Sequence, residues 1–565
     1  MINSLPPGLI LLIGAFLVPF LPGRVRSLFM LALPLLGIWQ LTQLGHGDYG
    51  AMSLFGFQLV HFNVDKLSLV FGYIFYIAAF IGIVYALHKD DRLEETAALA
   101  YVGAAIGATF AGDFITLFVY WELTAITSVF IVWAGRSPRA YKAGQRYLII
   151  QVTSGVLLAA GAIVRANETG SITFENIGLD SPGGLLILLA FGIKAAFPLL
   201  HNWLQDSYPE ASETGTVFLS AFTTKLAVYA LARGFAGTEE LIWIGVTMTA
   251  FPIFYAVIEN DLRRVLVYSL NNQVGFMVAG VGIGTELALN GAAAHAFAHI
   301  LYKALLLMSV GAVLLRTGTA KGSELGGLYK TMPWTLGFCV VGSASISAFP
   351  LFSGFVTKTM ILAAAAEQGL VIPYLILLFA SAGVFHHSGI KIPFFTFFAH
   401  DSGKRPAEAP LNMLIAMGLA AALCIGIGVY PAPLYALLPF PVEYDPYTLS
   451  HVVTDLQLLL FSALAFAVLQ RTGLYPPELR STVLDFDWFY RRAAVSVCRT
   501  ITQWLSEGLA GIYSDFSSVI KNIITTAFRL HGPDGIMART NAVGGSVAII
   551  IVLLTLFMLV FYLQV

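Results

Sequence analysis

Charge is scarce in this sequence. Only 11% of its 565 residues are Asp, Glu, Lys or Arg, whereas soluble domains carry about 25%. Hydrophobic residues make up 58% of the chain, so we predict a polytopic membrane protein rather than a soluble one. The net charge of −1 gives no general reason to expect a nucleic-acid partner.

Cysteine and cofactor motifs are also scarce. The three cysteines, Cys339, Cys424 and Cys498, are far apart and predict neither a disulfide framework nor a metal or iron–sulfur site. We find no Walker or Rossmann loop, so we expect no cofactor and no enzymatic activity in this chain. A basic leader and a small-residue cleavage site are lacking too, and we interpret 9–21 as part of a retained first span.

Long apolar runs dominate the sequence instead, and a membrane span needs about 20 such residues. We expect spans near 7–22, 27–44, 66–87, 96–111, 114–134, 146–164, 185–204, 214–234, 241–258, 264–282, 289–315, 333–362, 370–398, 411–438, 452–470 and 543–564.

The loops predict the orientation. Basic residues follow the odd-numbered spans, at Arg24 and Arg26, Lys89 and Arg92, Arg136, Arg139 and Lys142, Arg263 and Arg264, Arg316, Lys321 and Lys330, and Lys404 and Arg405. The loops after even-numbered spans are acidic or nearly uncharged. By the positive-inside rule the N-terminus lies outside a bacterial inner membrane and the basic loops lie in the cytoplasm. The loop after the seventh span is an exception, because it carries acidic residues and no lysine or arginine.

Two lysines, Lys194 and Lys225, lie within apolar runs. A lysine at bilayer depth costs about 2.5–3.5 kcal/mol, so both are functional candidates, although a lysine near a helix end can also reach the interface. Pro198 follows Lys194 by four residues and predicts a broken helix. The run AFPLL at 196–200 returns as AFPLF at 348–352, and paired broken helices in two halves of a chain point to inverted repeats.

Further titratable residues lie in apolar context. Glu122 is well inside a span. A nearby lysine would favour its charged form, whereas an isolated Glu122 would be neutral. The alternative to a role in proton transfer is a fixed structural ion pair. His295, His299 and Lys303 are spaced by four, which places them along one helix face. Such a row can pass protons, with a zinc site and ordinary core histidines as alternatives.

Lys358 follows the second proline and is the next candidate. Secondary candidates are His201, Asp206, His386, His387 and Lys391. Because buried charges recur in so many spans despite their cost, we infer a polar, hydrated path for protons or small cations. Residues 474–540 mix large apolar side chains with Arg and Lys, which is typical of a helix lying in the membrane interface; a flexible linker is the alternative.

These motifs resemble the antiporter-like membrane subunits shared by respiratory complex I and Mrp-type Na+/H+ antiporters. The resemblance covers about 65–435 and is strongest to the Mrp D subunit. It rests on the Trp121-Glu122 helix, Gly192-Ile193-Lys194 with Phe197-Pro198-Leu199-Leu200-His201-Asn202-Trp203-Leu204, Asn260-Asp261-Leu262-Arg263-Arg264, the His295/His299/Lys303 helix and Gly354-Phe355 with Lys358.

The resemblance implies an all-α fold of about 14 core transmembrane helices with two inverted five-helix repeats, in which helices 7 and 12 are broken. It implies Glu122 and Lys194 as a charge pair, Lys225 as a connecting lysine, the His295/His299/Lys303 row as a central relay and Lys358 as the terminal lysine. The chain departs from many relatives at Ser212–Thr216, where they have Pro-Thr-Pro or Pro-Ser-Pro. The expected organisation is 1–95 for helices 1–3, 96–235 and 241–398 for the repeats, 399–470 for helices 14–15, 471–540 for an amphipathic cytoplasmic arm and 541–565 for the last span.

We therefore predict a proton-translocating subunit of a multi-subunit Na+/H+ antiporter, with other membrane subunits, protons, Na+ and the lipid bilayer as its partners. Three alternatives stay open. The chain could be a non-redox pumping subunit of a complex I-like NADH dehydrogenase or membrane hydrogenase, a subunit of an inorganic-carbon uptake system, or a membrane scaffold with inert buried charges.

Overall fold

The computed structural model describes residues 5–54, 56–475, 478–479, 483–533, 535 and 543–563. Parts of the expected arm, including Arg480 and 536–540, lie outside the described residues. Within them, twelve helices are long and apolar enough to cross a membrane, and three shorter apolar helices accompany them. The chain is thus an all-α polytopic membrane protein, and it divides into two compact units, 1–483 and 484–565.

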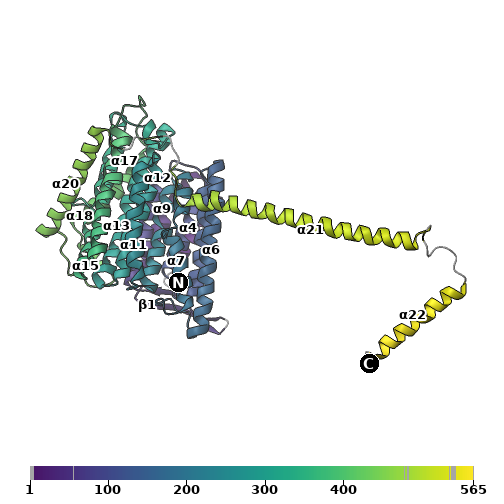
Figure 1. The fold of residues 1–565 in the computed structure, drawn as a ribbon. Helices are drawn as coiled ribbons and strands as arrows, with labels where there is room; N and C mark the ends of the chain where they lie inside the picture. The colour runs from purple at the N-terminus through teal and green to yellow at the C-terminus, as the bar shows by residue number, and fades with distance from the viewer. Residues whose placement is uncertain are drawn as a thin grey trace. The chain divides into compact units, whose positions relative to one another are not determined.

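The first unit is a helical bundle (Figure 1). Its helices are α1 Leu9–Leu17, α2 Gly23–Gln43, α3 Lys66–Ala86, α4 Arg92–Thr109, α5 Phe114–Trp133, α6 Pro138–Thr169, α7 Pro182–Ala195, α8 Asn202–Ser207, α9 Gly215–Ala221, α10 Thr223–Gly234, α11 Glu240–Ile258, α12 Leu262–Ile283, α13 Glu286–Thr317, α14 Pro333–Ile346, α15 Ser353–Glu367, α16 Val371–Val384, α17 Lys391–Pro393, α18 Leu411–Val429, α19 Ala432–Leu437 and α20 Leu449–Thr472. The π-helix η6 Phe385–Ile390 joins α16 to α17, and a second π-helix, η7 Phe394–Phe398, extends the same run after α17. Each expected span coincides with a helix or a helix pair.

The ends of these helices follow from local sequence. The carboxylates of Asp65, Asp113 and Asp261 accept backbone N–H groups in the first turns of α3, α5 and α12, as N-cap residues do. At the other end, Gly284 and Gly318 close α12 and α13 in the left-handed conformation. The loops thus carry the residues at which these helices begin and end.

A β-hairpin lies between α2 and α3, where the sequence predicted only a loop. Strand β1 Gly47–Leu54 pairs antiparallel with β2 Phe57–Val64, with Tyr49 opposite Phe62. The two rings stack with their centroids 4.7 Å apart. Phe62 and Val64 are buried against the bundle, so the hairpin covers one end of the helices.

Both predicted helix breaks are present, and they share one backbone pattern. Between α7 and α8, Ala196 and Leu199 have φ angles of 63° and 70°. Between α14 and α15, Ala348 and Leu351 have φ angles of 59° and 74°. The alanine and phenylalanine N–H groups also bond to equivalent carbonyls, three and five residues upstream, in the two breaks. The five-residue sequence repeat is therefore also a repeat of structure.

A third break, between α9 and α10, was not predicted. The sequence there contains neither proline nor glycine, and Phe222 alone separates the two helices. The Tyr101 hydroxyl of α4 accepts the Thr223 N–H at 2.9 Å and bonds with its Oγ1 at 2.6 Å. A side chain from another helix therefore replaces a helical acceptor, which is a recognised cause of kinking.

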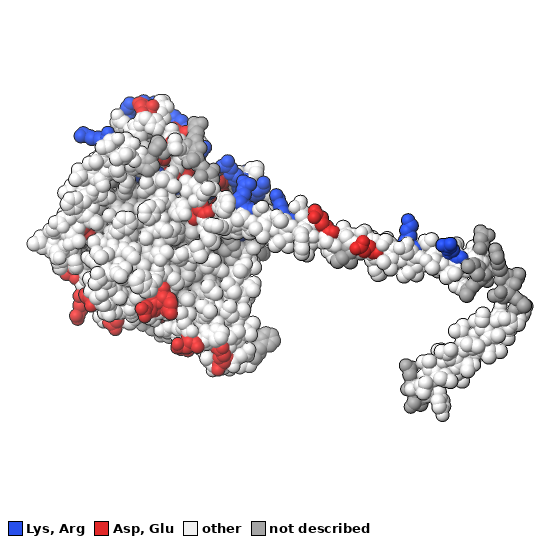
Figure 2. Space-filling model, viewed as in Figure 1, with Lys and Arg blue, Asp and Glu red and all other residues white. Residues whose placement is uncertain are grey.

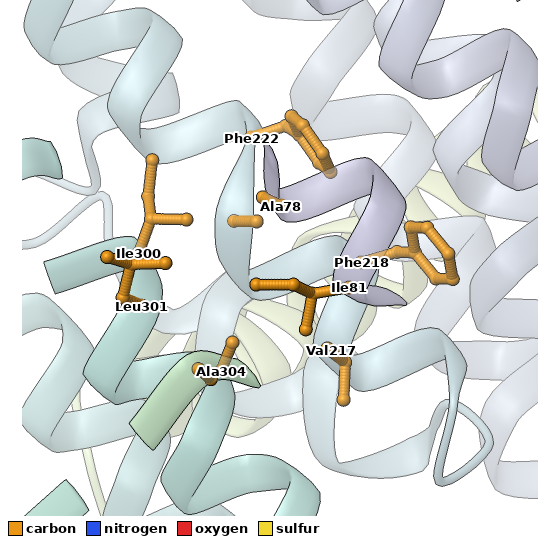
Figure 3. Close-up of a pocket in the computed structure, with 10 residues that line it drawn as sticks. Ala78, Ile81, Val217, Phe218, Phe222, Ile300, Leu301 and Ala304 are labelled. Carbon is orange, nitrogen blue, oxygen red and sulfur yellow. The ribbon is translucent and has the colours of Figure 1, made fainter. Parts of the chain in front are cut away.

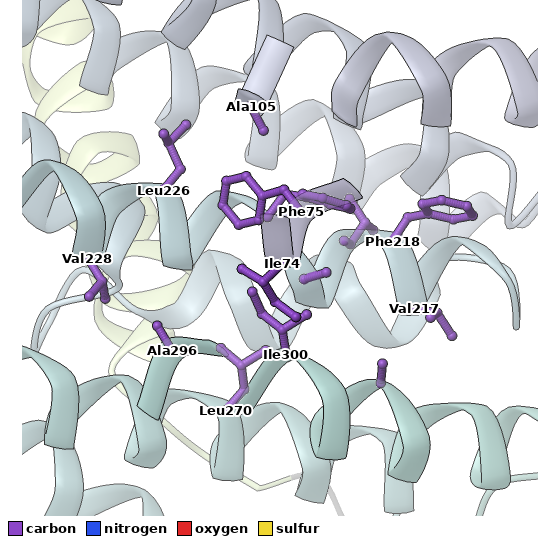
Figure 4. Close-up of a cluster of buried hydrophobic side chains, with 14 of the residues drawn as sticks. Ile74, Phe75, Ala105, Val217, Phe218, Leu226, Val228, Leu270, Ala296 and Ile300 are labelled. Atoms are coloured by element: carbon purple, nitrogen blue, oxygen red, sulfur yellow. The ribbon is translucent and has the colours of Figure 1, made fainter. Parts of the chain in front are cut away.

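Helix α13 is the centre of the bundle. It packs against α3, α9, α12, α14, α15 and α18, and its residues from Asn290 to Val313 are buried. Figure 4 shows Ile300 of α13 together with Ile74 and Phe75 of α3 and Phe218 of α9 in the apolar core. The polar groups on α13 in this region are therefore buried inside the bundle.

In its described residues the second unit contains the π-helix η8 Phe489–Ala493, followed by α21 Ala494–His531 and α22 Val543–Leu563. Helix α21 has 38 residues, which gives it a length of about 57 Å. Val497, Ile501, Trp504 and Leu505 recur on it at helical spacing and are exposed, which makes the helix amphipathic. Helix α22 is apolar throughout.

Charged side chains differ between the two ends of the bundle. In Figure 2, acidic side chains gather at the end where Figure 1 places β1, and no lysine or arginine is visible there on this face. Lysine and arginine gather at the opposite end. The two ends thus have the asymmetry that the loop sequences predicted.

Candidate functional site

Lys194 lies in the last turn of α7, next to the first break, and is fully buried. Its Nζ donates to the Trp121 carbonyl oxygen at 2.6 Å and to Thr124 Oγ1 at 2.7 Å. It also lies 4.3 Å from the centroid of the Trp121 ring, a cation–π contact. Helix α5 therefore provides the surroundings of this charge.

Glu122 is on the same helix α5 and interacts electrostatically with Lys194. Both hydrogen bonds that the described structure gives to Lys194 avoid this carboxyl, and Glu122 Oε1 has no hydrogen-bond partner there. The carboxyl occupies a notch at Gly155 of α6, where a Cβ atom would lie 1.3 Å from Oε1. The charge pair predicted from sequence is thus close but not directly bonded.

Lys225 is fully buried in the first turn of α10, beside the third break. Its Nζ donates to the Ser220 carbonyl oxygen at 2.7 Å and to Thr224 Oγ1 at 3.2 Å. Ser220 is on α9, and the change of direction at Phe222 makes its carbonyl available. The break therefore creates the acceptor that holds this lysine.

The central row on α13 is fully buried. His295 Nδ1 bonds with Thr357 Oγ1 at 3.1 Å, and its Nε2 bonds with Gln273 Oε1 at 3.1 Å. The Tyr302 hydroxyl donates to the same Gln273 oxygen at 3.0 Å. His295 thereby links α13 to α12 and α15 through polar side chains.

His299 and Lys303 continue the row. The rings of His295 and His299 stack with centroids 6.3 Å apart, and neither nitrogen of His299 has a hydrogen-bond partner in the described part of the chain. Lys303 Nζ donates to the Leu266 carbonyl oxygen at 3.2 Å and to Ser269 Oγ at 2.8 Å. The four-residue spacing thus places the three groups on one face, as predicted.

Lys358 is buried on α15 after the second break. Its Nζ donates to the Ile346 carbonyl oxygen at 3.0 Å and to Ser381 Oγ at 3.4 Å, and it lies 5.2 Å from the Phe276 ring. Asp455 of α20 is 5% exposed and interacts electrostatically with this lysine. Asp455 was missed, although a single carboxylate in an apolar span was a visible signal.

The secondary candidates do not gather at one place. Asp206 of α8 makes an ion pair with Arg146 of α6, with contacts of 2.7 and 3.0 Å, and His201 packs against the Phe251 ring. Lys391 is buried and makes an ion pair of 3.0 Å with Glu478. Asp206 therefore serves to join α6 and α8, whereas the region around Lys391 approaches the central row.

A cavity of about 10 Å³ lies beside the third break. Figure 3 shows Phe222 and Val217 on one side of it and Ile300 and Ala304 of α13 on the other. All ten side chains that line it are apolar, so a water there would find no side-chain partner. The contact of α3 and α9 with α13 is thus apolar at this point.

Comparisons with known proteins show the family of the chain. The family described as NADH:quinone oxidoreductase/Mrp antiporter, transmembrane, matches residues 111–385. The N subunit of the NADH-quinone oxidoreductase of Desulforudis audaxviator is 30% identical over 346 residues, which are 56% of this chain and 68% of that protein. The chain belongs to this family.

Two further similarities concern a curated relative and a solved structure, and the second is a similarity of fold. The D subunit of the Na(+)/H(+) antiporter of Alkalihalophilus pseudofirmus is 31% identical over 287 residues, 47% of this chain and 58% of that protein. A chain of the membrane-bound sulfane sulfur reductase, an archaeal respiratory membrane complex, superposes with a TM-score of 0.71 at 21% identity, covering 98% of this chain and 100% of that one. Three curated relatives, the Alkalihalophilus protein among them, are matched over only 38%, 63% and 58% of their own lengths.

Several polar partners of this family member were missed from sequence. Gln273, Tyr302, Ser269 and Thr357 bond directly to the central histidine and lysine or to each other. Their signal was weak, because uncharged polar residues are tolerated in spans at lower cost than charges. Only the packing of α12 and α15 against α13 identifies them.

Proposed function

We propose that this chain is a proton-translocating subunit of a multi-subunit cation/proton antiporter. Glu122 and Lys194, Lys225, the His295/His299/Lys303 row and Lys358 carry the proton in this proposal, and Na+ is the exchanged cation. In this proposal the chain is a transport subunit and not itself an enzyme. Family membership supports a transport role.

One observation supports the proposal most strongly. Lys194, Lys225, Lys303 and Lys358 are all fully buried within the helical bundle, and each donates to backbone and hydroxyl oxygens rather than to a carboxylate. Structural lysines in membranes normally reach the interface or form ion pairs. Lysines held by neutral oxygens can lose and regain a proton without breaking an ion pair.

The orientation belongs to the same proposal. We assign the end with the β-hairpin and the acidic side chains to the outside, and the end with the basic loops to the cytoplasm of a bacterial inner membrane. The boundaries 1–95, 96–235, 241–398, 399–470, 471–540 and 541–565, with two inverted repeats, remain part of it. Helix α21 then lies in the membrane interface, where its exposed apolar face contacts lipid or a neighbouring subunit.

The test is proton flux in proteoliposomes that contain the whole complex. We expect Lys303→Met or Lys194→Ala to abolish cation-driven proton movement, because each removes a titratable group from the path. Lys321→Met, on an exposed loop, is the matched control and should leave flux unchanged. Full flux in a folded Lys303→Met complex would refute the proposal and favour a scaffold.

A second candidate function is a pump subunit driven by a redox complex. The similarity to the N subunit of an NADH-quinone oxidoreductase favours it. Purification of the chain in mild detergent, followed by mass spectrometry, separates the two. Co-purifying antiporter subunits would support cation/proton exchange, and iron–sulfur or flavin subunits would support a redox-driven pump. A co-purifying protein that forms or binds bicarbonate would support inorganic-carbon uptake.

A further inference from the structure

A chain of hydrogen bonds leaves the central row sideways, towards α16 and α17. Lys303 Nζ donates to Ser269 Oγ at 2.8 Å, and Ser388 Oγ donates to the same Ser269 oxygen at 2.8 Å. Ser388 Oγ also bonds with His387 Nδ1 at 2.9 Å. All four side chains are fully buried. Three bonds thus connect Lys303 on α13 with a histidine on another span.

The end of this hydrogen-bond chain that is farthest from Lys303 lies in a π-helix. His387 and Ser388 belong to the π-helix η6 within the span 371–398, and π-helical turns are frequently found at functional sites. His387 Nε2 is buried and has no hydrogen-bond partner among the described residues. An imidazole with one nitrogen on a serine and the other unoccupied can accept a proton on one side and release it on the other.

Lys391 follows His387 by one helical turn. Its Nζ donates to the carbonyl oxygens of Val257 and Glu259 at 2.7 Å each, at the end of α11, and makes the ion pair with Glu478. Figure 1 places α17 near the end opposite the hairpin, and Arg264, whose side chain is 29% exposed, lies 3.8 Å from Glu259 there. The cluster of Lys391, Glu478 and Glu259 therefore lies between the buried hydrogen-bond chain and the basic end of the bundle.

The two carboxyls of the cluster lie in loops, and burial affects both. Burial raises the pKa of Glu259 and of Glu478, while Arg264 and Lys391 act in the opposite direction. A raised pKa lets a carboxyl hold a proton closer to neutral pH. Glu259 Oε2 is buried without a hydrogen-bond partner in the described structure.

We propose that His387, Ser388 and Ser269 form a branch that loads Lys303 with protons from the basic end, with Glu478 and Lys391 at its entrance. This inference rests on the proposed function. The His387 Nδ1 proton moves to Ser388 Oγ, the Ser388 hydroxyl proton moves to Ser269 Oγ, and the Ser269 hydroxyl proton moves to the Nζ of a neutral Lys303. Each serine gains and loses one proton, so the net result is one proton transferred from histidine to lysine.

The branch gives the second half of the protein its own supply of protons. Among the described residues, the hydrogen bonds of Lys225 go to Ser220 and Thr224 and not to the α13 row, whereas hydrogen bonds connect His387 with Lys303 without a gap. Lys303 then receives protons without passage through Lys194 and Lys225. The central row acts as a junction rather than as a link in a single line.

The experiment uses Ser388→Ala in the whole complex in proteoliposomes. Loss of the central hydroxyl interrupts the branch, and we expect proton flux to fall about tenfold or more, as when a positioned proton-transfer group is removed. Ser388→Thr keeps a hydroxyl and should restore most of the flux. Ser343→Ala is the matched control, because Ser343 Oγ donates to the main-chain carbonyl oxygen of Ser388, at 3.2 Å, and is off the branch.

Ser269→Ala and Ser269→Thr repeat the test from the other helix in case Ser388→Ala does not fold. Thermal unfolding in detergent checks that each variant is intact. If Lys303→Met abolishes flux while both serine-to-alanine variants retain it, the branch is refuted and the proposed function stands. If Lys303→Met itself retains full flux, the proposed function fails. Equal losses in the alanine and threonine variants would mean that the serines serve only packing, which also refutes the branch.

Discussion

Gly155→Ala is the most direct way to disturb the Glu122 site without touching a titratable residue. An alanine Cβ would lie 1.3 Å from Glu122 Oε1 and 2.4 Å from its Cδ. The conflict is with the end of a flexible side chain, so the carboxyl can move. To reach an ordinary contact of 3.4 Å, Oε1 must shift by about 2 Å, because 3.4 − 1.3 = 2.1.

The expected stability change is small because two effects oppose each other. Alanine in place of glycine within a helix stabilises it by about 0.8–1 kcal/mol. A strained glutamate rotamer costs about 0.5–1.5 kcal/mol. The free energy of unfolding should therefore change by less than about 1 kcal/mol, which thermal unfolding in detergent can measure.

The expected change in flux is larger. The shift changes the distance between the interacting charges of Glu122 and Lys194. For two unit charges at an effective dielectric constant of about 20, an increase from about 5 to about 7 Å removes about 1 kcal/mol of interaction. That loss corresponds to about a fivefold reduction in proton flux if the Glu122–Lys194 interaction controls transfer. Proteoliposomes with a pH-sensitive dye inside report the rate.

The double variant with Glu122→Asp makes the test decisive. Aspartate is one methylene shorter and fits beside the Cβ that Gly155→Ala introduces, so the two changes should not be additive. Gly337→Ala is the control, since its Cβ would meet no atom within 4 Å. Normal flux in Gly155→Ala, or strict additivity in the double variant, would refute the reasoning.

Two further predictions concern the second half of the bundle. Gly354→Ala should prevent folding or destabilise the protein by about 3 kcal/mol or more, because its Cβ would lie 1.8 Å from the Ser345 carbonyl oxygen; a stable variant in thermal unfolding would contradict the geometry of the second break. Asp455→Asn should leave unfolding nearly unchanged but lower proton flux severalfold, because it removes the charge that interacts with Lys358; flux equal to that of the unmodified complex would show that Asp455 does not influence this lysine.

The sequence predicted the spans, the two proline breaks and the buried charges because each depends on local composition. Pro198 and Pro350 predict the two breaks because proline lacks the backbone N–H that a helix needs. The break at Phe222 could not be predicted, because its cause is the Tyr101 hydroxyl from a helix more than 100 residues earlier. The hairpin was missed for a similar reason, since strand pairing depends on the register between two segments.

The candidate residues were predictable, but their partners were not. The four-residue spacing of His295, His299 and Lys303 indicates a shared face, yet nothing in it indicates that Gln273 and Ser269 bond to that face. Asp206 shows the converse, because a candidate chosen from its position turned out to pair with Arg146. Tertiary packing decides which polar groups meet.

The buried lysines share one kind of anchor, and it has a genetic consequence. Lys194, Lys225, Lys303 and Lys358 each donate to a main-chain carbonyl, and every amino acid has that carbonyl. A saturation mutagenesis screen should therefore find the lysines intolerant of change, while Ser220 and Ile346, which supply carbonyl oxygens and are buried, accept replacements of similar size. The most informative positions for function would then be those whose side chains, and not their backbones, hold the proton.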